Sequence, residues 1–119
     1  DLGQLMLGVK TDSDHSEDYY SPSILGARDL GRWVHFGCVY DGADRYVSHF
    51  VDGKEVSREE VRAPTRLSIN SGEIGNWFPE DLRDNRIRSL NGRLDEFMLL
   101  SSPLTSEEMR EIYVAGKPE

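Results

Sequence analysis

The stretch that decides the fold reads WVHFGCVYDG at residues 33–42 and continues as RYVSHFVDGKEV at residues 45–56. Apolar side chains alternate along both halves and occur on both faces, which is typical of strands that lie between two layers. Asp41-Gly42 and Asp52-Gly53 are tight-turn signals, and at the second we expect positive φ at both central residues. Three strands joined by two such turns predict an antiparallel meander.

Two segments precede this meander. Residues 4–9 place Leu5, Leu7 and Val9 on one face and Met6 on the other, and predict a strand. Residues 11–22 are polar and acidic and predict a loop. Tyr19 and Tyr20 in this loop have two possible roles, as aromatic platforms for a ligand or as a cover for the edge of a sheet. The second role is the commoner one.

Several short strands are expected after the meander. Residues 66–69 and 72–75 are expected as short strands separated by Asn70-Ser71, and residues 92–100 alternate over a longer run. Residues 78–90 between them are rich in charged side chains and predict a long polar excursion. Together with the earlier segments, this pattern predicts an all-β fold, an antiparallel β-sandwich or jelly roll with one short C-terminal helix.

The C-terminal helix has clear start and stop signals. Thr105 and Glu108 have the spacing of a capping box, in which each side chain satisfies a backbone N–H left free at the helix start. Leu104 and Met109 stand at the positions of a hydrophobic staple around that cap. Gly116 is placed to end the helix in the left-handed conformation. A helix this short is marginal alone, so we expect it to dock on the sheet.

Composition limits the possible partners. The 119 residues suit one small domain, and 22 acidic against 14 basic residues give a net charge of −8. This balance argues against nucleic acid as a partner, because phosphate binding needs a basic patch. No apolar run is long enough to span a membrane, so we expect membrane contact only through a parent protein. The single cysteine, Cys38, is expected as a small buried hydrophobe.

The order of motifs resembles a known family. GRWVHF at 31–36, VYDG at 39–42 and FVDGK at 50–54 are followed by NGRLDEF at 91–97 and LTSEEM at 104–109. This succession resembles laminin-G-like domains of the concanavalin A-like lectin/glucanase superfamily, in the bacterial exported form found in FecR-type signalling proteins. The resemblance implies a β-sandwich over residues 1–119 as one domain.

The resemblance also implies that strands are missing. Family members usually begin with strands that have no match here, and the chain opens at Asp1 without a methionine. We therefore expect an N-terminally truncated sandwich excised from a longer polypeptide, whose lost strands could be supplied by a neighbouring chain. Unpaired strand edges invite association, so a homo-oligomer formed through edge strands is expected.

Catalysis is not expected. A glycoside hydrolase needs two carboxylates converging on a cleft, whereas Asp95 and Glu96 are adjacent on an expected strand and point to opposite faces. The three histidines, His15, His35 and His49, are scattered along the chain. The resemblance implies that Asp95 could contribute to a structural calcium site, and the alternative is that it bonds to nearby backbone N–H groups.

Recognition is the function that these features favour. An exposed aromatic ring could stack on a sugar, and the candidates are Trp77 first, then Tyr19 and Tyr20, whereas Trp33 is expected in the core. We expect a non-catalytic module of an exported bacterial protein, extracellular or periplasmic, that binds carbohydrate or a protein partner. The alternatives are a structural or oligomerisation domain of a FecR-type signalling or surface protein, and an accessory domain of a glycoside hydrolase.

Overall fold

A computed structural model describes residues 3–11, 15–69, 72, 74–77 and 88–117. The chain divides into two compact units. The larger unit is made of Asp1–Arg66 and Ser101–Glu119, and the smaller is Leu67–Leu100. The predicted meander and the C-terminal helix both belong to the larger unit, so the elements with the strongest sequence signals lie in the same unit.

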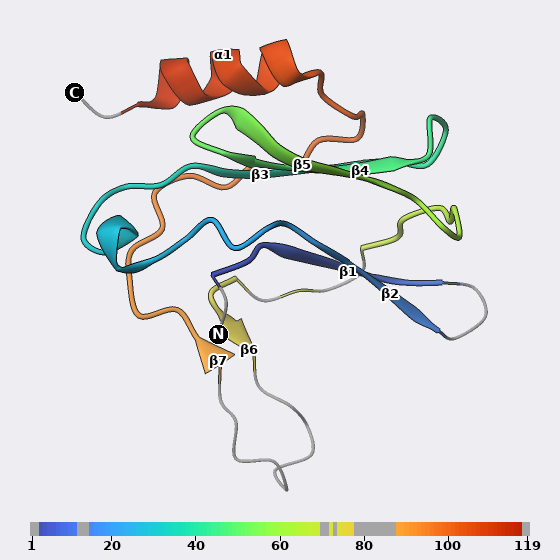
Figure 1. Cartoon of the computed structure of the whole chain (residues 1–119), viewed down its shortest axis with the longest axis horizontal. Coiled ribbons are helices and arrows are strands. Elements are labelled where there is room, and N and C mark those ends of the chain that lie inside the picture. Colours follow the sequence, from blue (N-terminus) through green and yellow to red (C-terminus); the bar gives the residue numbers. More distant parts are fainter. Residues whose placement is uncertain (1–2, 12–14, 70–71, 73, 78–87, 118–119) are drawn as a thin grey trace, which may run out of the picture. The chain divides into compact units, whose positions relative to one another are not determined.

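The predicted meander is confirmed. Strands β3 (Phe36–Asp41), β4 (Tyr46–Val51) and β5 (Lys54–Glu60) form an antiparallel sheet with β4 in the middle (Figure 1). The turn between β4 and β5 has φ of 50° at Asp52 and 71° at Gly53, as the Asp-Gly signal predicts. Strand β5 is longer than the sequence suggested, because its charged second half still pairs with β4.

The loop predicted for residues 11–22 is wrong in its second half. Ser16–Tyr20 form strand β2, which pairs antiparallel with β1 (Met6–Lys10). Within β2 only Tyr19 is buried: it is 1% exposed, while its neighbours on the strand face outward. The polar residues around it made the segment look like a loop. The Ser21 hydroxyl extends the pairing by accepting a hydrogen bond from the backbone N–H of Leu5 at 2.8 Å.

The larger unit has three layers, with the β3–β5 sheet between the β1–β2 hairpin and the helix (Figure 1). On the hairpin side, Val47 of β4 packs with a buried cluster whose other members are Val9, Tyr19 and Val61. On the helix side, Phe50 of β4 packs with Val39 and Met109. Both faces of β4 are therefore buried, which confirms the prediction of a strand between two layers.

Helix α1 spans Ser106–Gly116 and begins as the sequence predicts. The Thr105 hydroxyl accepts a hydrogen bond from the backbone N–H of Glu108, whose carboxylate accepts one from the N–H of Thr105. Leu104 and Met109 pack in the same cluster, so the predicted staple is also confirmed. The left-handed cap at Gly116 is wrong, because the helix runs through Gly116 and ends at Lys117 in extended backbone with φ of −66°.

The smaller unit contains one short strand pair. Strand β6 (Asn76–Trp77) pairs antiparallel with β7 (Arg88–Ser89), and the N–H of Leu90 donates to the carbonyl of Gly75 at 2.6 Å. No strand occurs in the described parts of the segments predicted as strands at residues 66–69, 72–75 and 92–100. An alternating pattern indicates which side chains share a face, but a strand also needs a partner for its backbone.

Two residues that were expected to be buried, Trp33 and Cys38, are exposed. The expectation that Trp33 is buried is wrong, because its side chain is 50% exposed just before β3 begins. Cys38 is also exposed, although the surrounding protein desolvates its thiol enough to raise the pKa to about 11. Among the described residues, no helix has the length and apolar character needed to cross a membrane.

Candidate functional site

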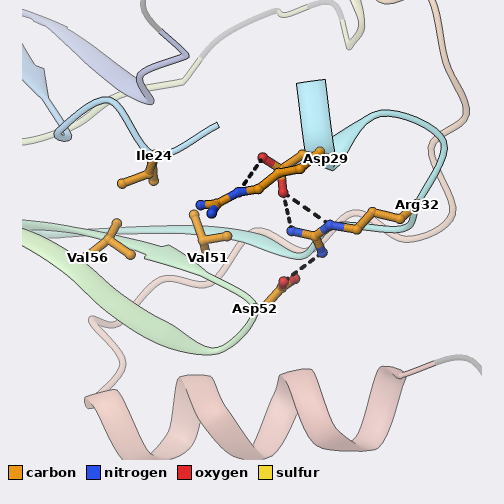
Figure 2. Close-up of a pocket in the computed structure, with 7 residues that line it drawn as sticks. Ile24, Asp29, Arg32, Val51, Asp52 and Val56 are labelled. Carbon is orange, nitrogen blue, oxygen red and sulfur yellow. Dashed lines mark hydrogen bonds and ion pairs between the residues drawn. The ribbon is translucent and has the colours of Figure 1, made fainter. Parts of the chain in front are cut away.

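The candidate site is a pocket of about 400 Å³ in the larger unit, beside the turn that joins β4 and β5 (Figure 2). A short 3-10 helix, η1 (Ala27–Asp29), and the residues that follow it bring Arg28, Asp29 and Arg32 to this turn, which carries a second aspartate. Aliphatic side chains complete the lining. The seven residues are Ile24, Arg28, Asp29, Arg32, Val51, Asp52 and Val56.

Asp29 is the best-bonded carboxylate of the pocket. One of its oxygens accepts from Nε of Arg32 at 3.2 Å and from Nη2 at 2.6 Å, and the other accepts from the N–H of Gly26 at 2.8 Å. The hydrogen bonds from Arg32 and then from Gly26 lower the pKa of Asp29. Because its side chain is only 11% exposed and stays ionised, Asp29 is a hydrogen-bond acceptor and a poor proton donor at neutral pH.

Arg32 joins the 3-10 helix region to the turn. Its Nη1 donates to Oδ2 of Asp52 at 2.8 Å, and the other oxygen of Asp52 accepts from the N–H of His35 at 3.0 Å. Nη1 also donates to the carbonyl of Trp33 at 3.2 Å. A planar guanidinium bonded on several sides has little freedom to rotate. The polar wall of the pocket is therefore held in place before any ligand arrives.

Arg28 differs from Arg32 because most of its donors are free. Its side chain is 82% exposed, and its Nε lies 3.7 Å from Oδ2 of Asp29, which is an ion pair but too long for a hydrogen bond. Arg28 therefore presents most of its N–H groups to solvent at the pocket. The two arginines and two aspartates of the lining sum to zero formal charge.

The opposite wall of the pocket is aliphatic. Figure 2 shows Ile24, Val51 and Val56 gathered together, while Asp29, Arg32 and Asp52 lie to the other side. Methyl groups of this kind pack against C–H surfaces, and the carboxylates and guanidinium groups accept from and donate to hydroxyl groups. The arrangement suits a ligand with an apolar face and many hydroxyls.

The residues proposed from sequence as sugar platforms do not line this pocket. Tyr19 is buried in the core, and the guanidinium of Arg62 lies 5.1 Å from its ring centroid, so its ring offers no free face for stacking. Tyr20 is exposed, and its hydroxyl donates to Asp18 at 3.3 Å. Trp77 pairs through its backbone with Arg88 in the smaller unit.

Asp95, proposed as a calcium ligand, is exposed in the smaller unit. Across the described residues, no three side chains of His, Cys, Asp or Glu converge in a way that could hold a metal ion. The structure therefore gives Asp95 no companion ligand from the part of the chain that it describes. Calcium binding stays a prediction from the family resemblance.

Sequence reasoning missed the pocket. Three of its four charged residues, Arg28, Asp29 and Arg32, fall between the two stretches that carried strand signals. The one available hint was the three-residue spacing of Asp29 and Arg32, which places opposite charges on one side of a helical turn. Asp52, the partner of Arg32, is far away in the sequence. It belongs to the Asp-Gly turn signal, which accounts for an aspartate at this position without any functional role.

Comparisons with known proteins agree with the fold. The family model of the concanavalin A-like lectin/glucanases superfamily matches residues 3–110. The chain is similar to a crystal structure of residues 221–444 of an S-layer domain-containing protein from Clostridium thermocellum, with a TM-score of 0.60 and 20% identity. The match covers 93% of this chain and 52% of that one, so the chain spans about half of its structural neighbour. No curated protein sequence matches. The family match establishes that this chain belongs to the concanavalin A-like lectin/glucanase superfamily.

Proposed function

We propose that the protein is a non-catalytic recognition module that binds a neutral carbohydrate in the pocket beside the β4–β5 turn. The observation that carries this proposal is the composition of the pocket, an aliphatic wall facing two carboxylates and two guanidinium groups of zero net charge. A sugar ring has a C–H face and a rim of hydroxyls, and these match the two walls. Membership of a superfamily that includes lectins supports the same assignment.

The bonding within the pocket supports recognition in preference to hydrolysis. A glycosidase needs one carboxylic acid with a raised pKa as proton donor. The pKa of Asp29 is shifted downward by its bonds from Arg32 and Gly26. Rigid charged side chains that already bond to one another, as Arg32 does with Asp29 and Asp52, are suited to orienting hydroxyl groups at little cost in side-chain entropy.

The proposal includes a location at the cell surface or outside the cell. The structural neighbour comes from an S-layer domain-containing protein, which supports a surface setting for a module of this fold. The bacterial exported origin and the FecR-type context rest on the resemblance of the sequence motifs to that family. Tyr20, Trp77 and a calcium ion at Asp95 stay as candidate contributors beyond the pocket.

Isothermal titration calorimetry with a panel of neutral oligosaccharides, with and without calcium, tests the proposal. Arg28→Gln removes the exposed guanidinium without touching the bonds of Arg32, and we expect it to weaken binding about tenfold, the effect of one hydrogen bond to a charged group. Arg66→Gln is the matched control, since it removes the same charge outside the pocket. Absence of binding to every sugar, or equal losses in both variants, contradicts the proposal.

A second candidate function is assembly. Within the smaller unit, a run of large apolar side chains is exposed. It comprises Leu94, Phe97, Met98, Leu99 and Leu100. An extended apolar segment of this kind is a template for strand pairing with another chain. Light scattering coupled to size-exclusion chromatography tests this candidate, which predicts a dimer or larger species that Phe97→Lys disperses, whereas a stable monomer at high concentration contradicts it.

A further inference from the structure

A second pocket lies on the other side of the Asp52-Gly53 turn, between this turn and helix α1. Its volume is about 460 Å³, and all of its lining residues belong to the larger unit. They are Asp52, Gly53, Lys54, Glu55, Ser106, Arg110, Tyr113 and Val114. Asp52 lines both pockets. The two pockets are therefore neighbours separated by one turn.

The acidic side chains of the second pocket are already engaged. Asp52 accepts from Arg32 at 2.8 Å and from the N–H of His35 at 3.0 Å. Glu55 accepts two hydrogen bonds from Arg58, at 3.0 and 2.9 Å, and a third from the Ser106 hydroxyl at 2.9 Å. Both negative charges are offset by arginines that do not line this pocket.

The basic side chains of the second pocket are different. Lys54 and Arg110 are both exposed, and neither forms an ion pair within the described part of the chain. Glu107 and Glu111 occupy the same helix but do not line the pocket. The second pocket therefore presents two unpaired positive charges in a chain whose net charge is −8. The lining itself sums to zero formal charge, but its two carboxylates are bonded to Arg32 and Arg58, so Lys54 and Arg110 are the charged groups left to bind an anion.

The helix side of the pocket adds apolar surface. Tyr113 packs directly over Gly53, where an added methyl group would lie 2.8 Å from the tyrosine Cβ, and Val114 is exposed beside it. The turn and the helix are thus locked together, so the spacing between Lys54 and Arg110 does not depend on a flexible loop. An apolar wall with two cations suits a ring that carries a negative charge.

We infer that the second pocket binds the carboxylate of an acidic sugar unit, next to a neutral unit held in the first pocket. The inference rests on the proposed function and extends it, because it makes the ligand an acidic polysaccharide that crosses the Asp52-Gly53 turn. Lys54 and Arg110 bind the carboxylate, and Val114 packs against the ring. The first pocket then binds a neutral sugar unit, and the two unpaired cations of the second pocket bind an acidic unit of the same polysaccharide.

Calorimetry with trigalacturonic acid and with its fully methyl-esterified form tests the inference, because the ester keeps the sugar backbone and replaces each negative charge with a neutral methyl ester. We expect the acid to bind at least tenfold more tightly than the ester at low salt, and this advantage to shrink as sodium chloride is raised. We expect Arg110→Gln and Lys54→Gln each to reduce the advantage several-fold, and Arg66→Gln to leave it unchanged. Equal affinity for acid and ester overturns the inference.

Two further arms separate the possible failures. If the unchanged protein binds neutral oligosaccharides but shows no preference for the acid over the ester, the inference about the second pocket fails and the proposed function stands. Arg110→Gln should bind neutral oligosaccharides as the unchanged protein does. If no sugar of either kind binds, the proposed function itself fails. Triglutamate is the third probe: binding as tight as that of trigalacturonic acid overturns the assignment to a sugar and indicates a peptide ligand. All variants change exposed side chains, and unchanged melting temperatures establish that they fold.

Discussion

Gly53→Ala should loosen the contact between helix α1 and the sheet, which holds the two pockets in register. Gly53 has φ of 71°, a conformation that costs an L-residue about 1–2 kcal/mol. A methyl group there would lie 2.8 Å from Cβ of Tyr113, 2.9 Å from Cδ1 and 3.0 Å from Cγ. The substitution therefore combines backbone strain with a steric clash against the root of a packed side chain.

The magnitude follows from adding these two costs. Overpacking of a tight contact costs about 1–3 kcal/mol. Replacing glycine also lowers the entropy of the unfolded chain, which returns about 0.4–1 kcal/mol. The net loss in the free energy of unfolding is about 1–4.5 kcal/mol, a large share of the ~5–15 kcal/mol that stabilises an ordinary domain. The assay is urea unfolding followed by tryptophan fluorescence and circular dichroism.

Three other glycines separate the two costs. Gly31→Ala meets positive φ with no atom within 4 Å, so it should cost about 1 kcal/mol. Gly37→Ala has ordinary φ but would lie 2.7 Å from Sδ of Met109, so it should cost about 1–2 kcal/mol, eased by the flexible methionine. Gly26→Ala meets neither problem and should be neutral or slightly stabilising. A Gly53→Ala protein no less stable than Gly31→Ala would refute the packing of Tyr113 on the turn.

Three more predictions concern single groups. The thiol of Cys38, with its pKa raised to about 11, should react with iodoacetamide slowly at pH 8 and reach its half-maximal rate near pH 11; a midpoint near 9 contradicts the desolvation. His49 is 2% exposed, and desolvation lowers its pKa, so the unfolded state takes up a proton at a higher pH than the folded state does. The contribution of His49 to the free energy of unfolding should therefore be complete above about pH 6.5 and fall as the pH falls below that value. In His49→Gln the free energy of unfolding should fall less steeply over the same pH range. Thr105→Ala removes the helix cap and should cost about 1 kcal/mol in urea unfolding, whereas Thr105→Ser should cost much less.

The sequence predicted the elements whose signals are local. The Asp52-Gly53 turn needs only two residues of the right kind, and the capping box needs only Thr105 and Glu108. The layered burial of β4 was readable because apolar side chains occupy both faces of a single strand. In each case, the physical cause lies within a few residues of the effect.

The features that sequence reasoning missed depend on distant partners. Strand β2 is held in place because Tyr19 packs in a core made by Val9, Val47 and Val61. The acidic residues next to Tyr19 in the sequence made the segment look like a loop. The expected strand at residues 92–100 has the right alternation but no paired partner in the described chain. An alternating segment indicates a face, and pairing depends on the rest of the sheet.

The candidate site was unpredictable for the same reason. Asp29 and Arg32 are close in sequence, but the pocket forms only when Arg32 bonds to Asp52, twenty residues away, across the turn of the meander. The sequence pointed to aromatic residues as sugar platforms, because an exposed aromatic ring can stack on a sugar. The structure instead brings charged side chains and aliphatic residues together.

The most direct test of the central claim is an amide chemical-shift titration of the ¹⁵N-labelled protein with neutral oligosaccharides. The account predicts saturable shifts that cluster at residues 24–32 and 51–56, the segments that line the first pocket, and that are weakened in Arg28→Gln. Shifts centred on Tyr20 or on the smaller unit, or no shifts at millimolar sugar, would contradict the claim that this pocket is the binding site.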